Sequence, residues 1–166
     1  MMPLEISQRF DHVREHFPHM AAYALVDGVQ YTRLTGARVT PSVRENRALF
    51  AGTEDAALAH AGPWLVSVAT AGASTLQTIS RLEQAYPSVL WLFSQLDMES
   101  LAQVLQVKLD ARLPDGQIAL MRFWDPRTLV ALYNALDATA RREYFSHVDE
   151  WHGQFEGNRF HITFYA

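Results

Sequence analysis

Two short apolar runs, separated by a helix-length segment, constrain the fold of this chain most. The runs are WLVSVA (64–69) and VLWLFSQ (89–95), and their length is typical of buried strands. Between them, Ser74 is placed to cap a helix that continues to about Tyr86. A third run, IALMRFW (118–124), follows a Pro-Asp-Gly turn. Strands that alternate with helices of this length predict βαβ units, and therefore an α/β fold with a mainly parallel sheet and helices on both faces.

The first third of the chain has a clear beginning and a weak middle. Residues 1–20 show helical spacing of apolar side chains, and Pro18 is expected to close this helix. The run YALVDG (23–28) predicts a first strand that ends at Asp-Gly. Between residues 31 and 61, breaking residues interrupt the pattern, so we expect loops with one short helix at most.

Three further helices and an edge strand are expected in the second half. Asp97 precedes one helix, and Asp125 with Pro126 begins another. Residues 158–166 carry apolar side chains at every second position, which predicts a half-buried antiparallel strand at the sheet edge. A last helix is predicted from the spacing of Tyr144, Val148, Trp151 and Phe155.

The composition excludes several classes of function. The 166 residues carry 18 acidic and 14 basic side chains, and the formal net charge of -4 argues against sequence-independent binding to nucleic acid or an anionic membrane. Because the chain has no cysteine, disulfides, thiolate nucleophiles and cysteine-ligated zinc are excluded. No apolar run approaches the length of a membrane span, and the first residues lack the basic-then-apolar order of a secretory signal. We therefore expect a cytoplasmic protein.

Arg122 and Asp125 stand out because they interrupt the otherwise apolar run LMRFWDPRTL (120–129). An aspartate followed by proline is typical of a helix start, so Asp125 is predicted to be an N-cap. Arg122 has apolar neighbours on its face of the expected strand and must either extend to solvent or find a carboxylate. Asp27, at the end of the first strand, is the predicted partner. We expect a structural ion pair rather than a catalytic arginine.

Three aspartates could form a first candidate site, because Asp27, Asp97 and Asp125 each follow a predicted strand. Ligands of open α/β sheets bind at the carboxyl ends of strands, where such carboxylates would hold magnesium or a phosphoryl group. The competing interpretation, which we favour, is that each aspartate ends a strand or caps a helix. No glycine-rich phosphate loop accompanies the three residues.

The second candidate site is HVREH (12–16), which fits the His-x-x-Glu-His pattern of one metalloprotease class. Its two histidines share one helical face, and Glu15 would be the general base. A zinc site also needs a third ligand, and no downstream acidic helix indicates one. A metal-dependent hydrolase that uses His12, Glu15 and His16 is therefore the alternative function, and an exposed polar helix face is the competing structural interpretation.

Several segments together resemble the Tap-type effector chaperones of type VI secretion, adaptors long catalogued only as a domain of unknown function. The resemblance covers residues 21–152, and its most specific part pairs a Pro-Trp-Leu-Val strand with an Arg-Phe-aromatic-Asp-Pro-Arg segment. The chain departs from the family in two places: Gln106-Val107-Lys108 stands where members often carry a basic, histidine-containing segment, and only one strand is expected after Trp151, where many members carry a longer C-terminal portion. The segments that carry the resemblance are YALVDG (23–28), AGPWLVSV (61–68), LFSQLDMESLAQVLQVKL (92–109) and DGQIALMRFWDPRTL (115–129), followed by Trp151.

The resemblance implies a binding function and no enzyme activity. Members of the family hold one toxic effector in the bacterial cytoplasm and help to load it onto the VgrG spike, so the implied partners are an effector and VgrG. No cofactor, metal or small-molecule substrate is implied. Residues 1–166 would form one effector-chaperone-like domain, with a helix in 1–20, a family core at 21–152 and a strand at 158–166. The motif residues carried over, as fold-maintaining or effector-binding residues, are Asp27, Pro63, Trp64, Arg122, Phe123, Asp125, Pro126 and Arg127.

The last strand is the candidate contact that the residues themselves indicate. FHITFYA (160–166) is able to offer a sheet edge that a partner's strand joins, with alternate side chains giving specificity. The competing interpretation is that most of this strand pairs within the chain. A general interaction module with no role in secretion is a third hypothesis for the function.

Overall fold

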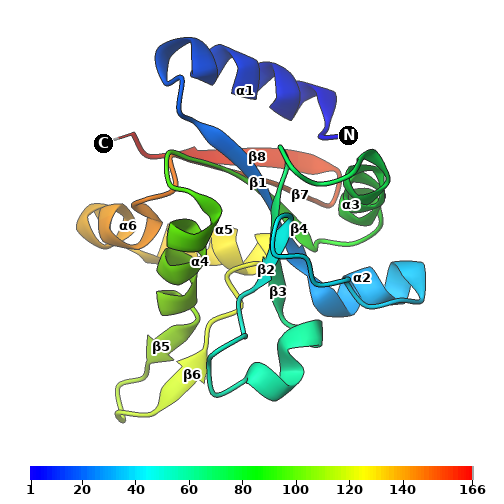
Figure 1. The fold of residues 1–166 in the computed structure, drawn as a ribbon. Helices are drawn as coiled ribbons and strands as arrows, with labels where there is room; N and C mark the ends of the chain where they lie inside the picture. Colours follow the sequence, from blue (N-terminus) through cyan, green and yellow to red (C-terminus); the bar gives the residue numbers. More distant parts are fainter. Residues whose placement is uncertain (166) are drawn as a thin grey trace.

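A six-stranded sheet forms the centre of the molecule in a computed structural model, which describes residues 1–165 (Figure 1). The strand order is β2-β3-β1-β4-β7-β8, and every neighbouring pair is antiparallel. The strands are β1 (Ala21–Asp27), β2 (Asn46–Ala48), β3 (Pro63–Ser67), β4 (Val89–Ser94), β7 (Glu150–Phe155) and β8 (Asn158–Thr163).

The prediction of a mainly parallel sheet is therefore wrong. The expected strand–helix–strand unit exists, since β3 leads through helix α3 (Ala73–Ala85) into β4. However, β1 lies between β3 and β4 and is antiparallel to both, so the two strands run in the same direction without pairing. Apolar periodicity reports how each element is buried, but it does not report which strands are neighbours. The expected antiparallel edge strand is confirmed, because β8 pairs with β7 at one end of the sheet.

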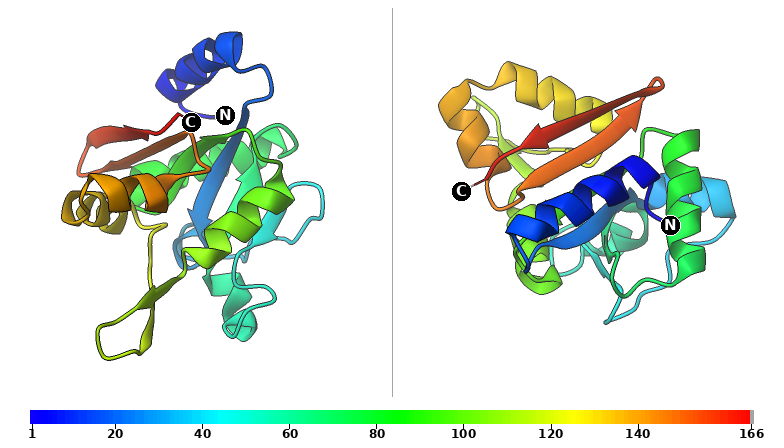
Figure 2. Two further views of the ribbon diagram at one scale, coloured as in Figure 1. Left: turned by 90° about the vertical axis from the view of Figure 1, so that its left-hand side faces the viewer. Right: turned by 90° about the horizontal axis from the view of Figure 1, so that it is seen from above.

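Helices cover both faces of the sheet (Figures 1 and 2). On one face, α1 (Leu4–His16) and α3 bury apolar side chains against Trp91 and Phe93 of β4. On the other face, α4 (Met98–Val107), α5 (Pro126–Ala135) and α6 (Ala138–Phe145) pack against the alternate side chains of the same strand. The strands thus carry apolar residues on both sides, which is why they read as continuous apolar runs.

The predicted third buried strand at 118–124 is wrong. Only β6 (Ile118–Leu120) is a strand, and it pairs with β5 (Asp110–Arg112) in a separate two-stranded hairpin that extends away from the body (Figure 2). Phe123 and Trp124 are both buried although they are consecutive, which a regular strand with one solvent-facing side does not allow. The apolar run therefore spans two environments: Ile118–Leu120 belongs to the projecting hairpin, and Phe123 and Trp124 belong to the core.

Four local predictions also differ from the structure. The weak region contains α2 (Gly28–Thr35), β2 and a short 3-10 helix, η1 (Ala56–Ala61), where loops with one short helix at most were expected. Gly72, not Ser74, precedes α3. The last helix predicted from Tyr144, Val148, Trp151 and Phe155 is wrong, because Trp151 and Phe155 lie on strand β7. Helix α6 ends at Phe145, and the chain turns at His147, which has a φ of 71°, into β7. The predicted C-terminal strand is formed over Asn158–Thr163, and residue 166 lies outside the described residues.

Candidate functional site

The predicted ion pair between Asp27 and Arg122 is present at the carboxyl end of β1. Arg122 Nη2 lies 3.3 Å from Asp27 Oδ2, and Trp124 Nε1 donates to the same oxygen at 3.2 Å. The other oxygen, Oδ1, accepts from the Gln30 amide at 3.0 Å and thereby caps α2. The Asp27 side chain is 5% exposed and that of Arg122 is 56% exposed, so the arginine covers a buried carboxylate while keeping contact with water.

Asp125 is the predicted N-cap of α5, and this prediction is confirmed. Its Oδ1 accepts from the Arg127 amide at 2.9 Å, and its Oδ2 accepts from Arg127 Nη2 at 2.8 Å. Hydrogen bonding to this carboxylate raises the pKa of Arg127 further above its ordinary value. Proline at position 126 starts the helix with φ already set.

The two aspartates and their arginines line one pocket of about 170 Å³, which we call the arginine pocket. The guanidinium of Arg33, from α2, lies 4.8 Å from the centre of the Tyr86 ring, a cation–π distance. Within residues 1–165, Arg33 makes no ion pair, in contrast to the two motif arginines. Guanidinium groups in such a pocket bind carboxylates and peptide oxygens. The lining residues are Asp27, Gln30, Arg33, Tyr86, Pro87, Arg122, Asp125 and Arg127.

The motif residues Pro63, Trp64 and Phe123 do not line this pocket and are buried in the fold. Pro63 faces Asp27 across the β1–β3 pair, and the Trp64 indole is buried, with its Nε1 donating to the His60 carbonyl at 3.4 Å. Phe123 is fully buried in edge-to-face contact with Trp124. Their side chains are not available to a partner, so their role is structural.

Comparison with known proteins places the chain in a family. The model of the Domain of unknown function DUF4123 matches residues 22–143, which is most of the chain. The chain belongs to the DUF4123 family. Neither the curated proteins nor the solved structures gave a match. The matched segment contains every residue of the arginine pocket and stops before β7.

The structure separates the three aspartates of the first candidate site. Asp27 and Asp125 both line the arginine pocket, whereas Asp97 caps α4 through the Ser100 amide at 2.8 Å. Because β1 and β4 are antiparallel, the end of β4 that leads to Asp97 lies beside the start of β1, at the opposite end of the sheet. The possibility that all three cluster is therefore wrong, and the favoured role of capping or ending a strand is confirmed for each.

The histidines of HVREH lie on an exposed face of α1 in this DUF4123 protein. His12 Nδ1 is 3.4 Å from a Glu15 oxygen, and both side chains are more than half exposed. The rings of His12 and His16 are 5.5 Å apart between centroids. Among residues 1–165, no three histidine, aspartate or glutamate side chains are grouped closely enough to hold a metal ion.

A buried polar cluster at the start of β7 was missed by the sequence analysis, which assigned this segment to a helix. The Glu150 carboxylate is fully buried and accepts from Arg9 Nε at 3.0 Å, with His152 Nε2 at 2.8 Å from its other oxygen. The Tyr165 hydroxyl donates to it as well. Burial alone would raise the pKa of Glu150, but the bonds from His152, Arg9 and Tyr165 lower it to about 2. The cluster joins α1, β7 and the C-terminal segment.

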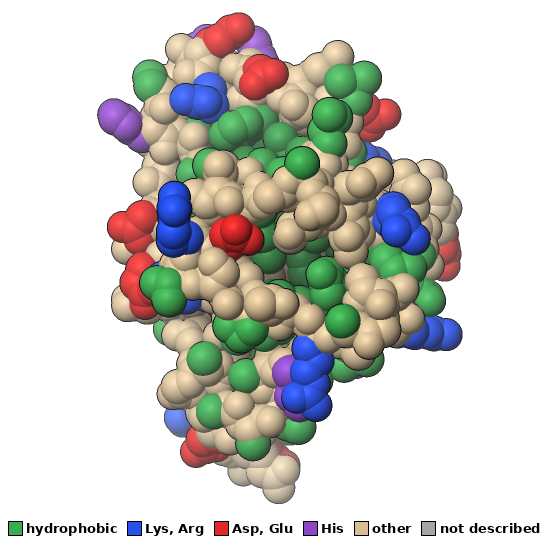
Figure 3. Space-filling view, turned by 45° about the vertical axis from the view of Figure 1, so that its right-hand side comes forward, with side chains coloured by type: hydrophobic (Ala, Val, Ile, Leu, Met, Phe, Trp, Pro, Cys, Tyr) green, Lys and Arg blue, Asp and Glu red, His purple; other side chains and the backbone are tan. Residues whose placement is uncertain are grey.

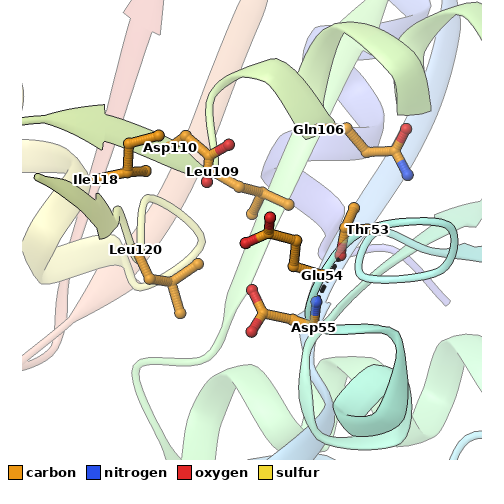
Figure 4. A pocket seen from close by; sticks show the side chains of 8 residues that line it. All are labelled: Thr53, Glu54, Asp55, Gln106, Leu109, Asp110, Ile118 and Leu120. Atoms are coloured by element: carbon orange, nitrogen blue, oxygen red, sulfur yellow. Dashed lines mark hydrogen bonds between the residues drawn. The ribbon is translucent and has the colours of Figure 1, made fainter.

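A groove of about 370 Å³ lies between the β5–β6 hairpin and the segment that precedes η1 (Figure 4). We call it the hairpin groove. Gln106 of α4 donates to the carbonyls of Leu49 and Ala51, both at 3.0 Å, and so fixes this segment against the helix. The groove is lined by Thr53, Glu54, Asp55, Gln106, Leu109, Asp110, Ile118 and Leu120.

The outer edge of β8 is partly protected. The strand pairs with β7 over Asn158–Thr163, which confirms pairing within the chain along its inner side. Arg159 crosses to α3, where it contacts the buried Glu83 at 2.9 Å, and approaches Glu5 of α1 at 3.5 Å. Charged side chains tied down in this way are typical of edges that do not recruit a partner strand.

Within residues 1–165, every helix is too short or too polar to span a membrane.

Proposed function

We propose that this DUF4123 protein is a cytoplasmic chaperone that binds one type VI secretion effector and helps to load it onto the VgrG spike. The observation that carries the proposal is the family match over residues 22–143, which falls within the segment that resembles the Tap-type chaperones. All eight motif residues of that resemblance lie inside the matched range.

The chemistry of the motif residues supports binding rather than catalysis. Asp27 and Asp125 each cap a helix and each pair with an arginine, so neither carboxylate is placed as a free base or nucleophile. Arginine and tyrosine side chains at a partly exposed pocket are common anchors in protein–protein interfaces. The arginine pocket therefore fits a contact with another polypeptide.

The distribution of charge also favours a protein partner. On the face that Figure 3 shows, acidic and basic side chains are scattered, and hydrophobic side chains lie in the hollows between them. A nucleic-acid partner would require basic side chains gathered on one face. An interface with another protein is mixed in this way, with apolar area inside a polar rim.

Co-purification tests the proposal. A tagged copy is expressed together with the toxin and VgrG genes that neighbour its own, and the untagged effector is expected to elute with it in a defined ratio. A matched pair of variants refines the result, since Arg33→Glu changes the arginine pocket and Arg38→Glu makes the same charge change outside it. Failure to recover any effector with the wild-type chain would contradict the proposal.

A further inference from the structure

The hairpin groove presents apolar side chains to solvent on a projecting element. Ile118 is 65% exposed and Leu120 is 45% exposed, and the strand alternation places them on one face of β6. The register sets Leu120 opposite Asp110 at the base of the hairpin and Ile118 opposite Arg112 two pairs farther out. Exposed branched side chains beside a groove are typical of a docking surface.

Three carboxylates surround this apolar face, from Glu54, Asp55 and Asp110 (Figure 4). Within residues 1–165, none of the three makes an ion pair, and no basic side chain lines the groove. They are also not grouped closely enough to hold a metal ion. Carboxylates that are spread along a groove are complementary to the ammonium or guanidinium groups of a polypeptide.

The hairpin backbone adds a second kind of complementarity. The β5–β6 pair is a sheet of its own, so each of its strands has one side without a paired strand in the described residues. A two-stranded hairpin is marginally stable alone and gains from a third strand. Peptides bind to such edges in extended form, with main-chain hydrogen bonds for affinity and alternate side chains for specificity.

From these observations we propose that the hairpin groove binds an extended segment of a partner polypeptide that carries large apolar residues and lysine or arginine at every second position, so that both kinds of side chain point into the groove. The apolar residues pack on Leu109, Ile118 and Leu120, and the cationic side chains face the three carboxylates. Because Arg112 lies on the outer part of the same face, the cationic positions are confined to the base of the hairpin. The identity of this partner as the secreted effector rests on the proposed function, whereas the chemistry of the segment does not.

The test uses the full chain and a short, fluorescently labelled leucine–lysine peptide of repeated Leu-Thr-Lys-Thr, in which leucine and lysine occupy every second position and so face the same side. Binding is measured by fluorescence anisotropy. Glu54→Gln with Asp110→Asn is expected to raise the Kd roughly fivefold, which corresponds to about 1 kcal/mol for the loss of two exposed ion pairs. The matched control, Asp11→Asn with Glu15→Gln on α1, makes the same change in net charge outside the groove. It is expected to leave the Kd unchanged at a fixed salt concentration.

A second pair of variants tests the apolar half without changing the charge. Ile118→Ser is expected to weaken binding. Val43→Ser, which changes another exposed β-branched side chain but lies outside the groove, is expected to leave binding unchanged. The same peptide with glutamate in place of each lysine is expected not to bind. The thermal unfolding midpoint of each variant is measured first, and the exposure of these side chains predicts midpoints close to that of the wild type.

Three outcomes would overturn the proposal: no binding of the leucine–lysine peptide, equal loss of binding in both charge variants, or a dimeric wild type that Ile118→Ser converts to a monomer. The last outcome would mean that a second copy of the chain covers the groove. These outcomes are independent of the effector co-purification, which can succeed while the groove fails to bind the peptide, or the reverse.

Discussion

The buried Glu150 carboxylate should make the protein acid-sensitive in a way that can be isolated with one substitution. Its pKa is lowered from the ordinary 4.5 to about 2 in the folded chain. Such a group stabilises the fold fully above pH 4.5, and the stabilisation is lost as the pH falls toward 2. The shift corresponds to about 3 kcal/mol of the free energy of unfolding at neutral pH.

Glu150→Gln removes the titration while keeping the shape of the side chain. We expect the free energy of unfolding of the wild type to exceed that of the variant by about 3 kcal/mol at pH 7, and by less than half of that at pH 3. Urea unfolding at a series of pH values, followed by tryptophan fluorescence, measures the difference. Glu15→Gln, at an exposed glutamate of α1, is the control and should show almost no difference at any pH.

A Glu150→Gln difference that stays constant between pH 7 and pH 3 would refute the reasoning, because the glutamate would then titrate alike in the folded and unfolded chains. A variant as stable as the wild type at pH 7 would do the same. Either result would mean that the bonds from Arg9 and Tyr165 do not outweigh the cost of burying the carboxylate.

Three further predictions follow from the site. Arg122→Ala should lower the free energy of unfolding by only about 1 kcal/mol, because its guanidinium is half-exposed, while Trp124→Phe should cost about 2 kcal/mol by removing a buried bond to a carboxylate; equal losses in urea unfolding would contradict this order. Gly28→Ala should cost about 2 kcal/mol or more, since its Cβ would clash with the His60 backbone oxygen, whereas Gly72→Ala meets nothing within 4 Å and should change the melting temperature little. Metal analysis of the purified protein should find no stoichiometric zinc, and a bound ion that His12→Ala releases would revive the hydrolase hypothesis.

Local features of the fold were readable from the sequence because they depend on neighbouring residues. The caps at Asp97 and Asp125 and the strand at 89–94 follow from side-chain chemistry within a few positions. The pairing of Asp27 with Arg122 was predictable for another reason, since a charge within an apolar run needs a partner. That Arg122 both pairs with Asp27 and stays half-exposed was not predicted, because residues 121–124 form no strand.

Features that depend on distant residues escaped prediction. Nothing in the runs at 63–67 and 89–94 indicates that β1 would insert between them. Arg33 and Tyr86 reach the arginine pocket from segments 53 residues apart in sequence, and α2 itself lay in a region of weak periodicity. The Glu150 cluster was hidden because a buried carboxylate is recognisable only once Arg9 and Tyr165 are seen beside it.

The way α1 and the last two strands close the molecule has a practical consequence for work on this family. A chain cut to the matched residues 22–143 would lack the strand that pairs with β4 and the helix that shields Phe93, whose ring lies 5.0 Å from that of Phe10. Without β7, one edge of the central strand β4 is open, and an open apolar edge beside bare aromatic rings favours aggregation over folding. We expect the trimmed chain to be insoluble, so the segment that defines the family by sequence is smaller than the unit that folds.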